Sequence, residues 1–211
     1  MKENKFAIGI PTLNRYDLLK PSLMLYAKDF PNIEIFLLDN GNQNIQNFSH
    51  VHLIQADKNY GVAASWNILC NKIFARGYEN ALILNDDIYL GQTTPVINFL
   101  LERKKYKGQF LRATPDWCAF IISKKIWDNV GNFNEEFYPA YYEDNSYEYR
   151  MRLKGYNPIK LVELNPYVYR SSQTMEKDPQ MAEIVKNNKK LYIEMWGGEP
   201  KQEKFKTPFN K

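Results

Sequence analysis

The sequence predicts an α/β fold in which a mostly parallel central sheet is flanked by helices. Short apolar runs alternate with longer segments whose apolar residues recur at helical spacing. In addition, the apolar run at residues 81–84 leads directly into Asn85, Asp86 and Asp87. Polar residues at the carboxyl end of a buried strand are typical of the ligand-binding edge of such a sheet.

The first three predicted elements are a strand, a helix and a strand. Residues 6–10 form a short apolar run, which we expect to end at Pro11 because proline cannot donate to a sheet. Residues 15–28 carry leucines at helical spacing and predict a helix. Residues 33–38 form a second apolar run, and the turn-forming residues 39–42 follow it.

The alternation continues through the next four elements. Residues 51–54 predict a third strand and residues 62–76 a helix. Residues 81–84 predict a fourth strand and residues 94–103 a further helix. Parallel strands need crossover connections, so helices should cover both faces of the sheet.

Aromatic residues become more frequent in the second half of the chain. Residues 120–123 predict a strand and residues 124–130 a short helix. Residues 143–154 and 181–195 predict two longer helices, each followed by glycine. The polar residues 199–211 should lie on the surface as a tail.

Composition indicates a globular protein with a real core. The chain has 211 residues, of which 44% are hydrophobic and 15% aromatic. Its net charge of +4 is small and its basic residues are scattered, so we expect no nucleic-acid partner. Cys70 and Cys118 stand in apolar contexts without metal-ligand spacing, which favours buried free thiols in a reducing compartment. We see no signal peptide and no apolar run long enough for a transmembrane segment, and therefore expect a cytoplasmic protein.

Polar residues follow the first two predicted strands. After the first strand come Pro11, Thr12, Asn14 and Arg15. The guanidinium of Arg15 suits a phosphate, and Asp39 after the second strand suits a ribose hydroxyl or a base N–H. Each has a structural explanation as well, a helix N-cap for the first turn and an Asx-turn for Asp39.

The third polar segment begins the helix at residues 62–76. Gly61 would let the backbone approach a ligand closely, and Asn59 and Asn67 lie two turns apart and could face that ligand. The competing explanation is a helix N-terminus packed against the sheet.

Asn85, Asp86 and Asp87 offer hard oxygen ligands. Carboxylate and amide oxygens suit Mg²⁺ or Mn²⁺. Such a metal would in turn hold a diphosphate.

A second acidic pair, Glu143 and Asp144, opens a predicted helix after an aromatic run. It could supply a general base that faces a pocket lined by Trp117, Tyr141 and Tyr142, because flat aromatic rings stack well on sugar rings. The alternatives are acids stabilised by the helix dipole and aromatic residues that belong to the core.

In this order and spacing the motifs resemble family 2 glycosyltransferases of the GT-A fold. The matching segments are residues 10–15, Asp39, residues 59–61 with Asn67, and residues 85–87, 131–137 and 143–156. Together they cover residues 6 to about 156.

The resemblance implies a metal-dependent, inverting transfer of a hexosyl or deoxyhexosyl group from a nucleotide sugar to a hydroxyl of a glycan or glycoconjugate. Asp144 would be the catalytic base, Glu143 would help to bind the acceptor or the donor sugar, and Asp87 would bind Mn²⁺ or Mg²⁺. Asp39 suits a uracil nucleotide, which favours a UDP-sugar over a GDP-sugar. The residues implied to bind the nucleotide sugar are Pro11, Thr12, Asn14, Arg15, Asp39, Asn59, Gly61, Asn67, Asn85, Asp86 and Arg170. Trp117, Tyr141 and Tyr142 would bind the acceptor.

Three positions depart from the family pattern. Asn85 replaces a common acid, and Ser146 stands where a further aspartate is frequent. Residues 167–172, which include Arg170, occupy the region where many members place a metal-binding histidine. Asp87 would then be the only direct protein ligand, and Arg170 would suit a phosphate instead.

Two alternatives remain open. A nucleotidyltransferase would prefer a glycine-rich loop, which residues 11–15 are not. A non-catalytic nucleotide-sugar-binding domain of a larger glycan-assembly protein would not need both Asp87 and Asp144. We expect a single domain over residues 1–211. Within it, residues 1–104 would bind the donor, residues 105–175 would carry the acceptor and catalytic groups, and residues 176–211 would form a helix and tail.

Overall fold

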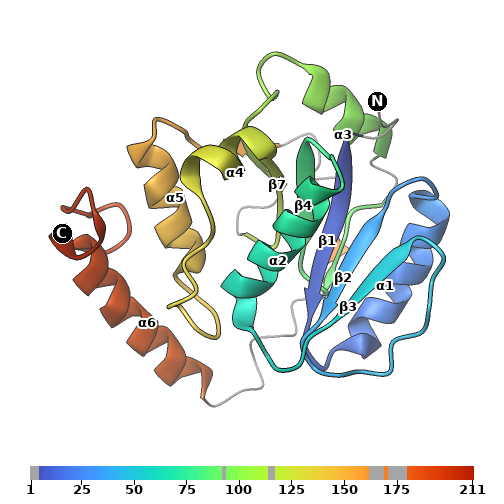
Figure 1. The fold of residues 1–211 in the computed structure, drawn as a ribbon, viewed down its shortest axis with the longest axis horizontal. Coiled ribbons are helices and arrows are strands. Elements are labelled where there is room, and N and C mark those ends of the chain that lie inside the picture. Colours follow the sequence, from blue (N-terminus) through green and yellow to red (C-terminus); the bar gives the residue numbers. More distant parts are fainter. Residues whose placement is uncertain (1–4, 92–93, 114–116, 162–168, 171–179) are drawn as a thin grey trace.

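The computed structural model of the protein describes residues 5–91, 94–113, 117–161, 169–170 and 180–211 (Figure 1). The elements of its first half are β1 (Phe6–Thr12), α1 (Tyr16–Asp29), β2 (Ile35–Asp39), β3 (Val51–Gln55), α2 (Gly61–Ala75), β4 (Asn80–Leu84), β5 (Ile88–Tyr89) and α3 (Thr94–Glu102). Those of its second half are β6 (Phe110–Arg112), β7 (Ala119–Ser123), α4 (Lys124–Val130), α5 (Glu143–Leu153), β8 (Ile159–Lys160), β9 (Tyr169–Arg170), α6 (Met181–Trp196) and a 3₁₀ helix at Pro208–Asn210.

The predicted α/β class is confirmed. In the described part of the chain, a seven-stranded sheet has the order β3-β2-β1-β4-β7-β6-β8. Its pairings are parallel except at β7, which runs antiparallel to both β4 and β6. Each predicted helix and strand is present, with ends within two residues of the predicted ones. Four strands of two or three residues, β5, β6, β8 and β9, were not predicted because they are too short to show a periodicity.

The first strand does not end at Pro11 as predicted, because β1 continues through Pro11 to Thr12. Pro11 pairs with Leu38 of β2, while the pairing of β1 with β4 ends at Gly9. The missing N–H of Pro11 therefore costs no hydrogen bond to β4, because β4 no longer pairs with β1 at this position.

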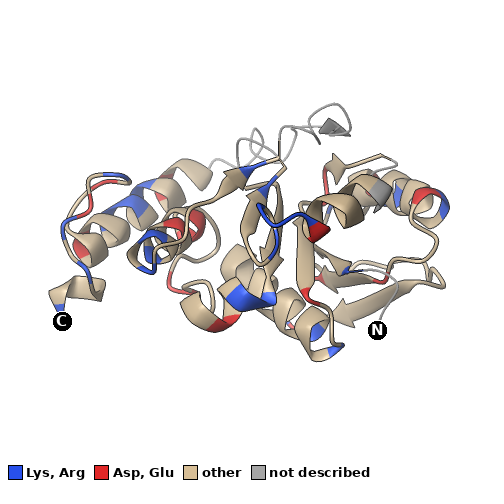
Figure 2. Cartoon of the chain, turned by 90° about the horizontal axis from the view of Figure 1, so that it is seen from above, with Lys and Arg blue, Asp and Glu red and all other residues tan. Residues whose placement is uncertain are grey.

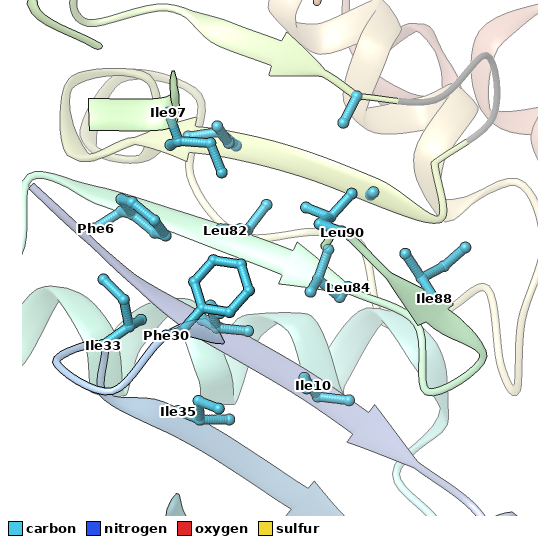
Figure 3. Close-up of a cluster of buried hydrophobic side chains, with 14 of the residues drawn as sticks. Phe6, Ile10, Phe30, Ile33, Ile35, Leu82, Leu84, Ile88, Leu90 and Ile97 are labelled. Atoms are coloured by element: carbon cyan, nitrogen blue, oxygen red, sulfur yellow. The ribbon is translucent and has the colours of Figure 1, made fainter. Parts of the chain in front are cut away.

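Helices cover both faces of the sheet, as expected. Alternate residues of β1 point to opposite faces, so Phe6, Ile8 and Ile10 join one core cluster and Ala7 joins the other. The first cluster lies under α1 and α3, and Figure 3 shows its side chains from β1, β2 and β4. The second cluster lies under α2, α4 and α5.

Gly9 lets α2 pack closely against the centre of the sheet. A Cβ atom at this position would lie 2.8 Å from Cδ1 of Ile83 and 3.2 Å from Cβ of Leu69, a residue of α2. The small residue thus lets the middle of α2 pack directly on β1.

Cys70 and Cys118 are both buried, as predicted, and form no disulfide within the described residues. Within the residues that the structure describes, none of the helices has both the length and the apolar character needed to cross a bilayer. Both signs of charge are interspersed along α6 and the segment after it (Figure 2).

Candidate functional site

The parallel strands bring the first turn and the acidic pair to one edge of the sheet. The hydroxyl of Thr12, at the end of β1, donates to Oδ2 of Asp86 over 2.9 Å. Asp86 and its neighbour Asp87 follow β4 and are 9% and 8% exposed. The edge thus holds two adjacent carboxylates that are mostly removed from water.

Burial is the main cause that raises the pKa of Asp86, to about 6, and the charge of Asp87 adds to it. The Thr12 hydroxyl and the charge of Arg15 act in the opposite direction. A site that disfavours negative charge in this way gains from a bound cation, and carboxylate oxygens fit Mn²⁺ or Mg²⁺. Among the described residues, no group of three or more His, Cys, Asp or Glu side chains could hold a metal. The two aspartates could therefore supply only part of a coordination shell, and water and ligand oxygens would supply the rest.

Arg15 stands beside this edge but is engaged by Asp17. Its Nε lies 3.1 Å from Oδ1 of Asp17, and its charge also interacts with Asp86 and Asp87. Asn14, the preceding exposed residue, adopts a left-handed conformation with φ of 54°. The turn after β1 thus presents polar groups at the same edge as the aspartates.

Asp39 forms the Asx-turn that was considered as its structural explanation. Its buried carboxylate accepts from the backbone N–H of Gly41 at 2.8 Å and of Gln43 at 2.6 Å. The side-chain amide of Gln43 donates to Asp39 as well, at 3.0 Å, and lies 3.4 Å from the Thr12 hydroxyl. Gln43 was not predicted to belong to this edge, because nothing in its local sequence distinguishes it.

Gly61 lies in close contact with another segment of the chain. With φ of +76°, a Cβ atom here would lie 2.7 Å from the carbonyl oxygen of Pro139. Val62 N–H donates to that same oxygen at 2.7 Å, and Asn59 Oδ1 accepts from Gly61 N–H. The glycine therefore permits the approach of another part of this chain.

The side chain of Asn67 is bonded to another segment of the chain. Its amide exchanges two hydrogen bonds with the backbone of Phe133, at 2.8 Å and 3.0 Å. It also donates to the side chain of Glu135 at 2.7 Å. The side chain is buried and holds the loop that leads toward α5.

The second acidic pair lies at the start of α5. Glu143 is 5% exposed, and its Oε2 atom has no hydrogen-bond partner within the described residues. Burial and the charge of Asp144 raise the pKa of Glu143 well above its usual value. Burial also raises the pKa of Asp144, although the backbone N–H of Asn145 donates to its Oδ1 at 2.8 Å.

Asp144 lines a cavity of about 240 Å³. The cavity is walled by Arg112, Trp117, Asp144, Asn145, Glu148, Arg152, Pro200, Lys201 and Glu203. Of these, only Asp144 and Trp117 were predicted as site residues. Glu148 and Arg152 are four residues apart on a predicted helix, so the sequence could have predicted that they pair. Nothing in the local sequence of Arg112 or of residues 200–203 indicates that they belong to a site.

The predicted aromatic platform is mostly core. Trp117 is 7% exposed and packs on Phe110, with ring centroids 4.7 Å apart. The ring of Tyr142 packs on Tyr192 at 5.5 Å. Tyr141 and Tyr142 both have left-handed backbone conformations, with φ of 75° and 74°. Packing against other aromatic residues thus accounts for Tyr142 and for most of the Trp117 ring.

The backbone of β9 pairs antiparallel with β5, which places Arg170 opposite Ile88. Ile88 directly follows Asp87. The backbone of β9, which belongs to the region where a metal-binding histidine was considered, therefore lies next to the acidic pair. Residues 167, 168, 171 and 172 of this predicted region lie outside the described residues.

No protein-family model matches the chain, and no curated protein matches it. Solved structures do. The mannosyltransferase PcManGT from Pyrobaculum calidifontis, in complex with GDP-Man and Mn²⁺, aligns with 74% of this chain at a TM-score of 0.58 and 11% identity. GalNAc-T7 with UDP, GalNAc and Mn²⁺ aligns with 94% of it at a TM-score of 0.68 and 12% identity. The alignments cover 54% and 49% of those chains, so this chain spans about half of their length. The protein has the GT-A fold.

Proposed function

We propose that this protein is an inverting glycosyltransferase of the family 2 type, which transfers a hexosyl or deoxyhexosyl group from a nucleotide sugar to a hydroxyl of a glycan or glycoconjugate. The observation that carries this proposal is a pair of separate acidic sites on a GT-A fold. Asp86 and Asp87 lie at the strand edge, and Glu143 and Asp144 lie at the start of α5 beside a cavity. A transferase needs both, one for the leaving diphosphate and one for the attacking hydroxyl.

The donor would bind at the strand edge. Asp87, with Asp86 beside it, would hold Mn²⁺ or Mg²⁺, which when bound supplies a Lewis acid that neutralises charge on the diphosphate. Thr12 orients Asp86, and Arg15 offers donors for a phosphate oxygen. The GDP-Man and UDP ligands of the two structural neighbours support this class of donor. We favour a UDP-sugar because Asp39 ends β2; to bind a uracil N–H, its buried carboxylate would exchange one of its bonds to Gly41 or Gln43.

Asp144 would take the proton of the acceptor hydroxyl. Its raised pKa brings it closer to neutral pH, where a general base is most effective. Glu143 would contact a substrate hydroxyl through its buried Oε2, the atom left without a partner within the described part of the chain.

To test this proposal, the protein is mixed with UDP-sugars and GDP-sugars, with and without Mn²⁺. The shift of its unfolding temperature reports donor binding, and the release of free sugar reports turnover. We expect one donor to stabilise the protein only with metal, and Asp87→Ala to abolish that shift. Asp144→Asn should keep the shift and lower turnover by about 10²- to 10⁴-fold. The exposed change Asp128→Asn is the matched control and should alter neither measurement.

The outcomes separate the alternatives. A donor-dependent shift without sugar release in the unaltered protein would indicate a binding module. Near-normal turnover in Asp144→Asn would remove this residue from the role of base.

A further inference from the structure

We propose that the cavity beside Asp144 binds an acceptor carrying an anionic oxygen group, a carboxylate or a phosphate, next to the attacked hydroxyl, and that Lys201 and Arg112 select it. This inference rests on the proposed function, which makes the cavity the acceptor site. It adds the chemical class of the acceptor and two specificity-determining residues.

The cavity is small and polar. Its volume of about 240 Å³ equals roughly eight water molecules at ~30 Å³ each. It therefore has room for a single small, oxygen-rich unit. The unit would lie against Asp144 on one side and against the segment after α6 on the other, because Lys201 belongs to that segment.

The charges that line the cavity are only partly matched to one another. Arg152 Nη2 lies 2.9 Å from Oε1 of Glu203, and Arg112 Nη1 lies 3.6 Å from Oε2 of Glu148. These contacts engage both glutamates with guanidinium groups. Within the described residues Lys201 takes part in no ion pair.

Two cationic residues of the cavity wall have donors without a protein acceptor among the described residues. Arg112 Nε is buried without a hydrogen-bond acceptor in the described part of the chain, which is costly for a charged group. Lys201 is exposed at the rim and has a left-handed backbone, with φ of +73°. Strained conformations of this kind are kept where the surrounding structure enforces them. Because Arg112 and Lys201 are both cationic and both line the cavity, the complementary ligand group is an anionic oxygen.

The chemistry of transfer strengthens this requirement. The lining contains three cations, Arg112, Arg152 and Lys201, and three carboxylates, Asp144, Glu148 and Glu203. When Asp144 takes the proton of the attacking hydroxyl, it becomes neutral and the lining acquires one net positive charge. An anionic group on the acceptor would compensate that charge.

The segment that carries Lys201 is held in place. Tyr192 donates to Oε1 of Glu203 at 2.6 Å, and the N–H groups of Lys204 and Phe205 donate to the carbonyl oxygen of Trp196 at 2.9 Å and 3.0 Å. Tyr149 donates to the carbonyl oxygen of Phe205 at 2.8 Å. Lys201 thus stands on a fixed wall, as a residue that discriminates between ligands must.

The test measures binding of three probes to the full chain by isothermal titration. The probes are methyl β-D-glucuronide, D-glucose 6-phosphate and the neutral methyl β-D-glucoside. We expect at least one anionic probe to bind ten-fold or more tightly than the glucoside. Lys201→Gln should reduce that preference at least five-fold, while Lys204→Gln, a matched change in the same segment outside the cavity, should keep it.

The anionic probe that binds better identifies carboxylate or phosphate as the preferred group. Equal or undetectable binding of all three probes, or a preference that survives Lys201→Gln, would overturn the inference. A thermal shift with UDP and Mn²⁺ is recorded on each variant. A thermal shift with UDP and Mn²⁺ but no preference for an anionic probe would leave the proposed function intact and overturn only this inference. An anion preference without that shift would leave the cavity as an anion site and count against the proposed function.

Discussion

At the scale of single residues, buried polar side chains in this protein are mostly satisfied by the backbone of neighbouring loops. Asp39 accepts two backbone N–H groups, and Asn67 both donates to and accepts from the backbone of Phe133. Such bonds are expected, because a buried polar atom without a partner is costly. Glu143 is an exception, with a buried Oε2 that has no partner among the described residues. An acid kept in such a place at a cost in stability is typical of a functional site.

We predict that Glu143→Gln stabilises the protein at alkaline pH. Burial and the charge of Asp144 raise the pKa of Glu143 well above its usual value of 4.5. The folded state therefore holds the proton more tightly than the unfolded state, and the free energy of unfolding falls as pH rises above about 4.5 toward the raised pKa. Glutamine has no proton to lose, so the advantage of the variant should grow between pH 5 and pH 8.

Urea denaturation at the two pH values, in metal-free buffer, measures this difference. Glu136→Gln, an exposed change in the loop before α5, is the control and should show no such growth. If the Glu143→Gln variant were less stable than the unaltered protein at pH 8, the buried carboxylate of Glu143 would not be destabilising, which would contradict this prediction.

At the scale of elements, the start of α2 is bonded to the loop that precedes α5. Val62 bonds to the carbonyl oxygen of Pro139, and Gly61 provides the space for that contact. Loop 138–139 is thereby tied to the region after β2 and β3. The approach to α5, and with it the position of Asp144, depends on this contact.

We predict that Gly61→Ala is more destabilising than Gly77→Ala. Both glycines have left-handed backbones, with φ of +76° and +85°, so alanine should cost about 1–2 kcal/mol at each. Only at Gly61 would the new Cβ atom meet Pro139 O at 2.7 Å, whereas nothing lies within 4 Å at Gly77. Overpacking should add about 1–3 kcal/mol at Gly61.

Denaturation of the two variants side by side isolates the steric part, because the backbone cost is shared. Equal losses would mean that loop 138–139 moves away freely. The contact between the start of α2 and Pro139 would then not determine the position of α5.

At the scale of the whole molecule, α5, α6 and the segment after α6 form one unit at the end opposite α1 (Figure 1). Glu203 joins all three, because Arg152 of α5 and Tyr192 of α6 both bond to it. Its side chain is only 4% exposed. One wall of the cavity beside Asp144 is therefore held by the contact of Arg152 with Glu203, 51 positions away.

We predict that Glu203→Gln destabilises the protein by about 1–3 kcal/mol at pH 7, because it weakens a buried, charge-assisted pair of bonds. Burial opposes ionisation of Glu203, but the Tyr192 hydroxyl, backbone N–H groups and Arg152 hold its pKa below the usual value. A lowered pKa contributes stability above the unfolded value of about 4.5, and this contribution is lost as pH falls through the folded pKa.

The loss caused by Glu203→Gln should therefore be smaller at pH 3.5 than at pH 7, as measured by thermal unfolding. Glu199→Gln, an exposed residue near the same turn, is the comparison and should change stability by less than about 0.5 kcal/mol. A pH-independent loss would show that Glu203 acts through packing and not through its charge.

Local patterns in the sequence were sufficient for most of the fold. The helices α2, α4 and α5 and the strands β1 and β4 carry periodicities that depend only on near neighbours. The meeting of Thr12 with Asp86 could also be anticipated, since the carboxyl ends of parallel strands share one edge. Strands β6 and β8 could not, because two or three residues contain no period.

The sequence by itself thus determined the fold class and the position of the acidic pair Asp86 and Asp87 after a buried strand. Only the tertiary structure decided what each polar residue faces. Asn67 lies on the predicted helix but turns to Phe133, 66 positions away, and Lys201 joins Asp144 at one cavity. The physical reason is that periodicity depends on neighbours in the chain, whereas the partners of a side chain are chosen by packing between distant segments.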